Sequence, residues 1–301
     1  MTLLPLLKPR YWLLWLFIGF LWSLTRLPHR WRLAVGRHIG HLGYRLAHRR
    51  RKIADINLKL CFPELNETER KKLLWQHFES LGMGLLEMLS AWWLPDNRLK
   101  PLGHIEGLEH LHTALAAGKG VILLSAHFTL LEIGIRFLTM YTTIHGAYRQ
   151  HENPLIEHFM KKSRESHAEK AIPRDAVREM LRSLKQNKAL WLATDQNFEQ
   201  GVFTPFFGIA AATNTAASRL AHISSAKVVP FFMQRIADQG YKIILQPALE
   251  NFPSGDKEQD ALRMNQLIEE QVRKAPEQYL WVHRRFKTRP VNEQLPLIKY
   301  Q

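Results

Sequence analysis

The chain has 301 residues and a formal net charge of +15 at pH 7, with 42 lysines and arginines against 27 aspartates and glutamates. This length allows one large α/β domain or two small ones. The charge points to an anionic partner, such as a membrane surface, an acidic protein, a phosphorylated substrate or nucleic acid. The single cysteine, Cys61, excludes an internal disulfide framework and a cysteine-based zinc site.

An uncharged, tryptophan-rich run extends from Tyr11 to Leu24. It is shorter than the roughly 20 residues that a helix needs to cross the hydrocarbon core. No small-residue cleavage site follows it, so a removable signal peptide is not expected. We expect residues 1–30 to form a membrane-anchoring helix, either as an uncleaved span or as an interfacial anchor. A helix of the folded core is the alternative.

Basic residues dominate the segment after this run. Ten lysines and arginines lie between Arg26 and Lys59, against one acid, Asp55. By the positive-inside rule, this asymmetry predicts that the bulk of the chain stays in the cytoplasm. An amphipathic interfacial helix on an anionic leaflet would use the same charges. A solvated helix face and an RNA-binding patch remain alternatives.

Helical and strand patterns alternate along the rest of the chain. Asn66 and Glu69 form a capping box at the start of one helix. Further helices are predicted at 108–117, 154–166, 175–186, 215–223 and 259–273, and strands at 121–124, 144–149, 189–194, 228–233 and 241–246. This order predicts an α/β fold with a mainly parallel sheet covered by helices on both faces. Residues 31–301 then form one domain, with a basic helical part at 31–100 and an α/β core at 101–301.

His127 is predicted at a strand-to-helix junction, where α/β sheets place reactive groups. Glu132 follows five positions later, and two such residues on one helix are about 140° apart around its axis. The two side chains therefore meet only if His127 lies in the turn and Glu132 points back towards it. Glu132 would then orient His127 as a general base. The alternative is a helix-capping histidine with Glu132 paired to a cation such as Arg136.

Further polar residues follow other predicted strands or lie close to them. Arg149 and Asp195 follow two strands directly, and Lys170 and Arg174 bound a third polar segment. Because the ends of parallel strands meet at one edge of a sheet, these residues could line a cleft with His127 and bind substrate. Arginine suits phosphate or carboxylate. Taken singly, each is equally a surface charge. No phosphate-binding glycine loop or His-Glu-x-x-His motif is present, and no metal is expected.

Several longer motifs run from one end of the chain to the other. They are Pro9-Arg-Tyr-Trp12, Leu60-Cys-Phe-Pro-Glu64, Phe78-Glu-Ser-Leu-Gly-Met83, His127-x4-Glu132, Tyr148-Arg149, Asn153-Pro-Leu155, Ala275-Pro-Glu-Gln-Tyr279 and His283-Arg-Arg-Phe-Lys-Thr-Arg-Pro290. With these motifs the chain resembles the late acyltransferases of bacterial lipid A biosynthesis, within the wider lysophospholipid acyltransferase group, and it looks most like the lauroyl-type branch. Around Asp195 the family's usual Pro-Asp-Gln-Asp-Tyr is replaced by Thr194-Asp-Gln-Asn-Phe198.

The resemblance implies an inner-membrane enzyme whose catalytic domain lies on the cytoplasmic side. Such an enzyme moves a fatty acyl chain, lauroyl-like here, from acyl carrier protein to a hydroxyl of a Kdo-bearing lipid IVA precursor, without metal or other cofactor. His127 and Glu132 would be the catalytic pair. Arg149, Lys170, Arg174 and Asp195 remain the expected substrate-binding residues.

Three other functions stay open at this point. The chain could acylate another lysophospholipid or glycolipid. It could also be a non-catalytic, membrane-bound lipid-binding protein in which the His127 motif is structural. A membrane-tethered nucleic-acid-binding protein is suggested by charge alone, and the sequence has no RNP-like motif or obvious recognition helix, so no nucleic-acid partner is expected.

Overall fold

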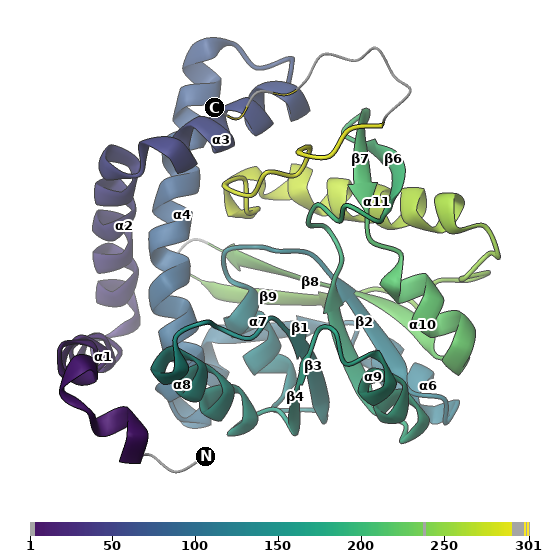
Figure 1. The fold of residues 1–301 in the computed structure, drawn as a ribbon, viewed down its shortest axis with the longest axis horizontal. Helices are drawn as coiled ribbons and strands as arrows, with labels where there is room; N and C mark the ends of the chain where they lie inside the picture. Colours follow the sequence, from purple (N-terminus) through teal and green to yellow (C-terminus); the bar gives the residue numbers. More distant parts are fainter. Residues whose placement is uncertain (1–3, 237–238, 291–297, 299, 301) are drawn as a thin grey trace.

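A seven-stranded sheet forms the centre of the computed structural model, which describes residues 4–236, 239–290, 298 and 300 (Figure 1). Its strand order is β1-β9-β8-β2-β5-β3-β4. The strands are β1 (Gly103–Glu106), β2 (Val121–Ser125), β3 (Ile144–Tyr148), β4 (Lys170–Pro173), β5 (Ala189–Ala193), β8 (Lys227–Ile236) and β9 (Gly240–Leu245). All neighbouring pairs are parallel except β8 and β9. The predicted, mainly parallel sheet is confirmed.

Helices cover both faces of this sheet. Successive side chains of a strand point to opposite faces, and β2 shows the result. Leu123 packs in one apolar cluster with Phe137, whereas Leu124 packs in a second cluster with Leu220 and Met264. The helices of this part are α6 (Leu108–Ala116), α7 (Leu131–Leu138), α8 (Pro154–Glu165), α9 (Val177–Lys185), α10 (Ala216–Ser224) and α11 (Lys257–Lys274).

The N-terminal third of the described chain is helical. Its elements are two 3-10 turns (Leu4–Leu7 and Pro9–Tyr11), α1 (Trp12–Leu24), α2 (His29–Leu46), α3 (His48–Cys61), α4 (Glu67–Trp93), α5 (Asp96–Leu99) and a third 3-10 turn (Lys100–Leu102). The long helix α4 starts at the predicted capping box, because the Asn66 side chain accepts from the backbone of Glu69 and the Glu69 side chain accepts from the backbone of Asn66. Helix α4 lies between α2 and the sheet (Figure 1).

Helices α2 and α4 touch backbone to backbone. A Cβ atom on Gly40 would lie 2.2 Å from the carbonyl oxygen of Phe78, and one on Gly82 would lie 2.1 Å from that of Gly36. No other residue fits these positions without moving a helix. Glycine therefore sets the spacing between the two helices.

Helix α1 is short and leaves most of its apolar surface uncovered. Its 13 residues span about 20 Å, whereas the hydrocarbon core of a bilayer is about 30 Å thick. Leu13 and Leu16 are 81% and 73% exposed. Trp15 instead packs edge-on against Phe159 of α8, with 5.1 Å between ring centroids.

Across the described residues, the structure holds no helix long and apolar enough to cross a membrane. A membrane-spanning helix, one of the two forms expected for residues 1–30, is therefore not found there. Residues 1–3 of that segment lie outside the described part.

An antiparallel hairpin stands apart from the sheet. It consists of β6 (Val202–Phe206) and β7 (Ile209–Thr213), and β6 packs on α11. The final turn, η4 (Pro276–Gln278), leads into the C-terminal segment that reaches the edge of the sheet near His127.

Candidate active site

His127 lies in the turn between β2 and α7, as the sequence predicts. Its Nδ1 atom lies 2.6 Å from Oδ1 of Asp195, and its backbone N–H donates to both carboxylate oxygens at 3.1 Å. Asp195 follows β5, the neighbour of β2, and Ser125 of β2 is in register with Ala193 of β5. His127 and Asp195 thus each follow the last paired residue of their strand by two positions, which brings them to the same sheet edge.

The Asp195 carboxylate holds the imidazole of His127 in one tautomer. Because a carboxylate only accepts, Nδ1 carries the proton and the lone pair of a neutral ring lies on Nε2. Burial favours the neutral form of His127, but attraction and hydrogen bonding to Asp195 outweigh it and raise the pKa of His127 above 6.5. Burial likewise opposes the charge of Asp195, yet His127 lowers the pKa of Asp195 to about 2. Asp195 is therefore ionised at neutral pH, and the His127 side chain keeps 26% of its surface exposed.

The C-terminal segment closes the other side of this pair. The Tyr279 side chain is buried, and the negative charge of Asp195 adds to burial in raising the pKa of Tyr279. The backbone N–H of Leu280 donates to the carbonyl of His127 at 2.9 Å. His283 accepts at Nε2 from the backbone N–H of Asn197, 3.1 Å away. Burial lowers the pKa of His283 to about 4, so this second histidine stays neutral beside His127.

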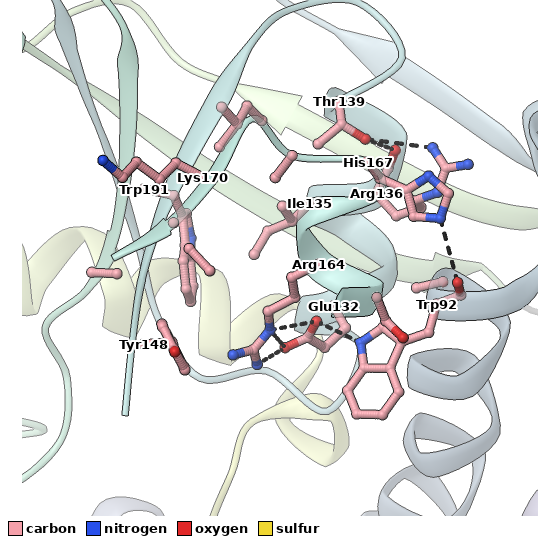
Figure 2. A pocket seen from close by; sticks show the side chains of 17 residues that line it. Trp92, Glu132, Ile135, Arg136, Thr139, Tyr148, Arg164, His167, Lys170 and Trp191 are labelled. Carbon is pink, nitrogen blue, oxygen red and sulfur yellow. Dashed lines mark hydrogen bonds and ion pairs between the residues drawn. The ribbon is translucent and has the colours of Figure 1, made fainter. Parts of the chain in front are cut away.

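Glu132 points away from His127, and the predicted contact between them is wrong. Glu132 accepts hydrogen bonds from Nε of Arg164, at 3.1 and 3.2 Å, and from Nε1 of Trp92, at 3.1 Å (Figure 2). A second guanidinium nitrogen of Arg164 also binds it. Glu132 lies in the first turn of α7, on the side that faces α8 and the end of α4, so the guanidinium of α8 satisfies it. Asp195, placed by the sequence among substrate-binding residues, takes the orienting position instead.

The alternative reading of the sequence, in which Glu132 pairs with a cation such as Arg136, is confirmed for the pairing but not for the partner, which is Arg164. Arg136 is bound by Asp96 and by the hydroxyl of Thr139.

The Glu132–Arg164 pair lies in the wall of a pocket between α7, α8 and the strands β3, β4 and β5. The cavity itself has a volume of about 50 Å³, and it lies within about 520 Å³ of empty space that includes open solvent. Much of its lining comes from apolar and small residues, namely Ala91, Ile135, Ile144, Gly146, Ala147, Ala168, Ala171 and Trp191. Ile135 and Trp191 lie on opposite walls, with the ion pair at one end (Figure 2). The shape and lining suit a narrow apolar group with a polar end.

The other expected substrate-binding residues do not gather around His127. Arg149 is 71% exposed and lies 3.9 Å from Glu152. Arg174 is 60% exposed and lies beside Asp175. Lys170 reaches the pocket lining but pairs with Glu179. The expected single cleft of His127, Arg149, Lys170 and Arg174 is therefore not formed, because loop residues past β3 and β4 turn to solvent and to nearby acids.

Three residues near the site were missed by the sequence analysis: Trp92, Arg164 and Tyr279. Tyr279 closes one of the family-like motifs, which was a usable signal. Arg164 is one of several cations on an amphipathic helix, and Trp92 is one of two adjacent tryptophans, so nothing local distinguishes them.

Proton transfer is the chemistry that this arrangement supports. Among the residues that the structure describes, no three His, Cys, Asp or Glu side chains are grouped to hold a metal ion. An oriented imidazole with a free Nε2 lone pair can take a proton from a hydroxyl held beside it.

A family model described as bacterial lipid A biosynthesis acyltransferase matches residues 3–288. The chain belongs to this family. It is an O-acyltransferase, as the family and the named relatives show.

Two relatives from Escherichia coli (strain K12) match the acyltransferase along almost its whole length. The lipid A biosynthesis lauroyltransferase is 40% identical over 299 residues, covering 96% of this chain and 98% of the relative. The lipid A biosynthesis palmitoleoyltransferase is 38% identical over 291 residues, covering 95% of each. The crystal structure of the 1-acyl-sn-glycerophosphate acyltransferase from Thermotoga maritima covers 81% of this chain and 95% of its own at 12% identity, with a TM-score of 0.38.

Proposed function

We propose that this acyltransferase transfers a fatty acyl chain from acyl carrier protein to a hydroxyl of a Kdo-bearing lipid IVA precursor. The observation that carries the proposal is the His127–Asp195 pair, which leaves one basic nitrogen at the partly open edge of the sheet. Family membership supports the lipid A precursor as the acceptor class.

In this mechanism the acceptor hydroxyl and the thioester react directly. Nε2 of His127 takes the hydroxyl proton while the oxygen attacks the thioester carbonyl. The tetrahedral intermediate then collapses, the carbon–sulfur bond breaks, and the imidazolium returns the proton to the departing thiolate. Asp195 holds Nδ1–H throughout and stabilises the imidazolium. No acyl-enzyme is required, so no side-chain nucleophile is needed.

The pocket beside Glu132 would hold the acyl chain. Burying a hydrocarbon chain against its apolar lining would contribute about 0.8 kcal/mol to binding per methylene. Two relatives with almost equal identity to this chain are named for different acyl groups, lauroyl and palmitoleoyl. We propose that the acyl chain is lauroyl-like. Glu132 and Arg164, at the end of the pocket, would contact the polar part of a substrate.

The enzyme would work at the inner membrane, with its catalytic domain on the cytoplasmic side. The exposed face of α1, together with Leu42 and Leu46 on α2, offers apolar surface for the interface. Basic residues of α2 and α3 adjoin this surface and suit anionic lipids and an acidic carrier protein. The anchor is thus interfacial in this proposal.

One assay tests the whole proposal. The purified full-length protein is incubated with lauroyl carrier protein and either the Kdo-bearing lipid IVA precursor or a lysophospholipid, and products are weighed by mass spectrometry. We expect a mass gain of one acyl group on the lipid IVA precursor alone. Transfer to the lysophospholipid alone would replace the proposed acceptor, and binding without transfer to either would leave a lipid-binding protein.

A further inference from the structure

A buried polar network ties the turn that carries His127 to the long helix α4. Thr129 lies in the middle of this turn, and its hydroxyl oxygen is 2.7 Å from that of Ser80 on α4. A Cβ atom on Gly84, one helical turn further along, would lie 2.3 Å from the Thr129 carbonyl oxygen. The turn therefore rests directly on the α4 backbone at that point.

Arg235 holds this contact from the other side. It lies near the end of β8, and its guanidinium donates to both oxygens of Glu87 on α4, at 2.6 and 2.5 Å. Its third nitrogen donates to the Ser80 hydroxyl at 3.1 Å. Since a guanidinium only donates, Ser80 keeps its own proton available for Thr129. The side chains of Arg235 and Glu87 are only 7% and 3% exposed.

A second route runs from Arg235 to the same turn through backbone groups. The Gln278 side chain accepts from the backbone N–H of Arg235 at 2.8 Å and donates to its carbonyl at 3.1 Å. The backbone carbonyl of Gln278 in turn accepts from the backbone N–H of Thr129 at 2.8 Å. Thr129 is thus held at its hydroxyl and at its amide, and both routes start at Arg235.

Net stability is a weak explanation for this network. Replacing a buried ion pair by well-packed apolar residues is often neutral or stabilising, because desolvation offsets the attraction between the charges. The position of the network offers a better explanation, because holding Thr129 in place also holds His127, two residues earlier. A shift of about 1 Å in a reacting group costs as much as a hundredfold in rate.

We propose that Arg235, Ser80 and Gln278 are positioning residues that act through Thr129 to hold His127 against Asp195. This inference rests on the proposed function, because it takes His127 as the base. Loss of the Ser80–Thr129 contact loosens the turn and lengthens the contact between His127 and Asp195. The catalytic rate then falls, and the basicity that Asp195 gives to His127 falls with it.

The test compares Thr129→Val with two matched variants. Valine keeps the shape of threonine and removes its hydroxyl, whereas Thr129→Ser keeps the hydroxyl. Ser90→Ala is the control, because Ser90 is an equally buried serine of α4 whose hydroxyl binds only the Leu86 carbonyl of its own helix. For Thr129→Val we expect kcat to fall about tenfold with KM within about twofold. Thr129→Ser and Ser90→Ala should stay within about twofold of the parent in both.

A second readout does not depend on acyl transfer. The pKa of His127 is followed by NMR titration of the imidazole signal that disappears in His127→Ala. Asp195 and His283 are the titratable groups that act on His127, and Tyr279 acts on Asp195; none of these three is changed. In Thr129→Val the His127 pKa should move down towards 6.5, and in Ser90→Ala it should stay.

The outcomes are distinct. Equal kinetics and an equal His127 pKa in Thr129→Val and Ser90→Ala would overturn the positioning role. If Thr129→Val does not fold, Ser80→Ala enters the same comparison and has to show the same shift. If the parent protein shows no acyl transfer, the proposed function is contradicted. The titration of His127 would still decide whether the network holds this residue in place.

Discussion

The two ends of the His127-x4-Glu132 motif have different surroundings. At its start, His127 is fixed by a carboxylate that is only 2% exposed and by the C-terminal segment. At its end, Glu132 binds a guanidinium in the wall of an open pocket. A His-x4-Glu spacing therefore need not form one dyad. In our proposal one end does the proton transfer and the other end meets the substrate.

Removing the imidazole at the first end should have the largest effect. We expect His127→Ala to lose transfer by about 10²–10⁴-fold, the range that general-base catalysis contributes. His145→Ala is the matched control, because His145 is 2% exposed on β3 and binds Ser183 rather than Asp195. Initial rates are measured on both purified variants after their folding is checked by circular dichroism. Near-normal turnover in folded His127→Ala would contradict the assignment of the base.

Asp195→Asn should have the next largest effect and should also change the pH dependence. The base must be neutral, so the ratio kcat/KM rises with pH through the His127 pKa, which Asp195 holds above 6.5. Without this negative charge we expect the rising limb to move to lower pH and the plateau to fall about a hundredfold or more. The measurement is a pH profile from about 5 to 9, and an unmoved limb would show that Asp195 does not set the basicity.

The same pair has a stability signature with a definite sign. His127 has a raised pKa, so its contribution is full below 6.5 and is lost as pH rises through the folded value. Asp195 has a lowered pKa of about 2, so its contribution is present above 3.8 and is lost as pH falls towards 2.

Changing the second end should reduce activity less and leave the pH profile unchanged. Glu132→Gln keeps the shape but weakens the charge-assisted contact with Arg164, so we expect roughly a tenfold loss in kcat/KM. Because Glu132 does not touch His127, the rising limb should stay where it is in the parent enzyme. If Glu132→Gln moves the rising limb of the pH profile as far as Asp195→Asn does, Glu132 and His127 would act together as one dyad.

Filling the pocket should alter the acyl chain that is used rather than the chemistry. Gly146 lies on β3 in the pocket wall, and a Cβ there would lie 3.9 Å from the Trp191 ring, so a larger side chain has room to enter. We expect Gly146→Leu to shift the ratio of kcat/KM values for short over long acyl donors about tenfold towards short chains. Competition between donors of different length measures this ratio within one reaction, and an unchanged ratio would place the acyl chain elsewhere.

Arg149 should show the smallest effect. The sequence pattern alone predicts a phosphate clamp and a loss of about tenfold in Arg149→Lys. The structure places this side chain in solvent beside Glu152, and exposed pairs contribute about 0–1 kcal/mol. From this position we expect a change in kcat/KM within about twofold, equal on phosphorylated and dephosphorylated acceptors. A tenfold loss confined to the phosphorylated acceptor would restore the clamp.

Local patterns in the sequence predicted much of the fold. The apolar run at 121–124 and the capping box at Asn66 both lie where expected, because burial and helix capping are decided within a few residues. The short strands β1, β4, β6 and β7 were not predicted, since four or five residues of mixed character carry little periodicity.

The site was predicted only as far as its position in the sheet. His127 and Asp195 both follow strands, and the sequence placed both at the same edge. It could not show that β2 and β5 are neighbours in register, which is a long-range fact and which makes Asp195 the partner of His127. Nor could spacing show that a cation 32 positions later on α8 would capture Glu132.

Between Ser80 and Gly84, helix α4 separates α2 from the turn that carries His127. At its glycines it contacts both through backbone atoms. On one side Gly82 meets the backbone of α2, and on the other Gly84 meets the turn at Thr129. Packed protein backbone is nearly incompressible, and these contacts have no rotamers that could absorb a displacement. A displacement of α2 is thus transmitted across the thickness of α4 to Thr129, two residues after His127. Helix α2 and the turn that carries His127 are therefore mechanically coupled through α4.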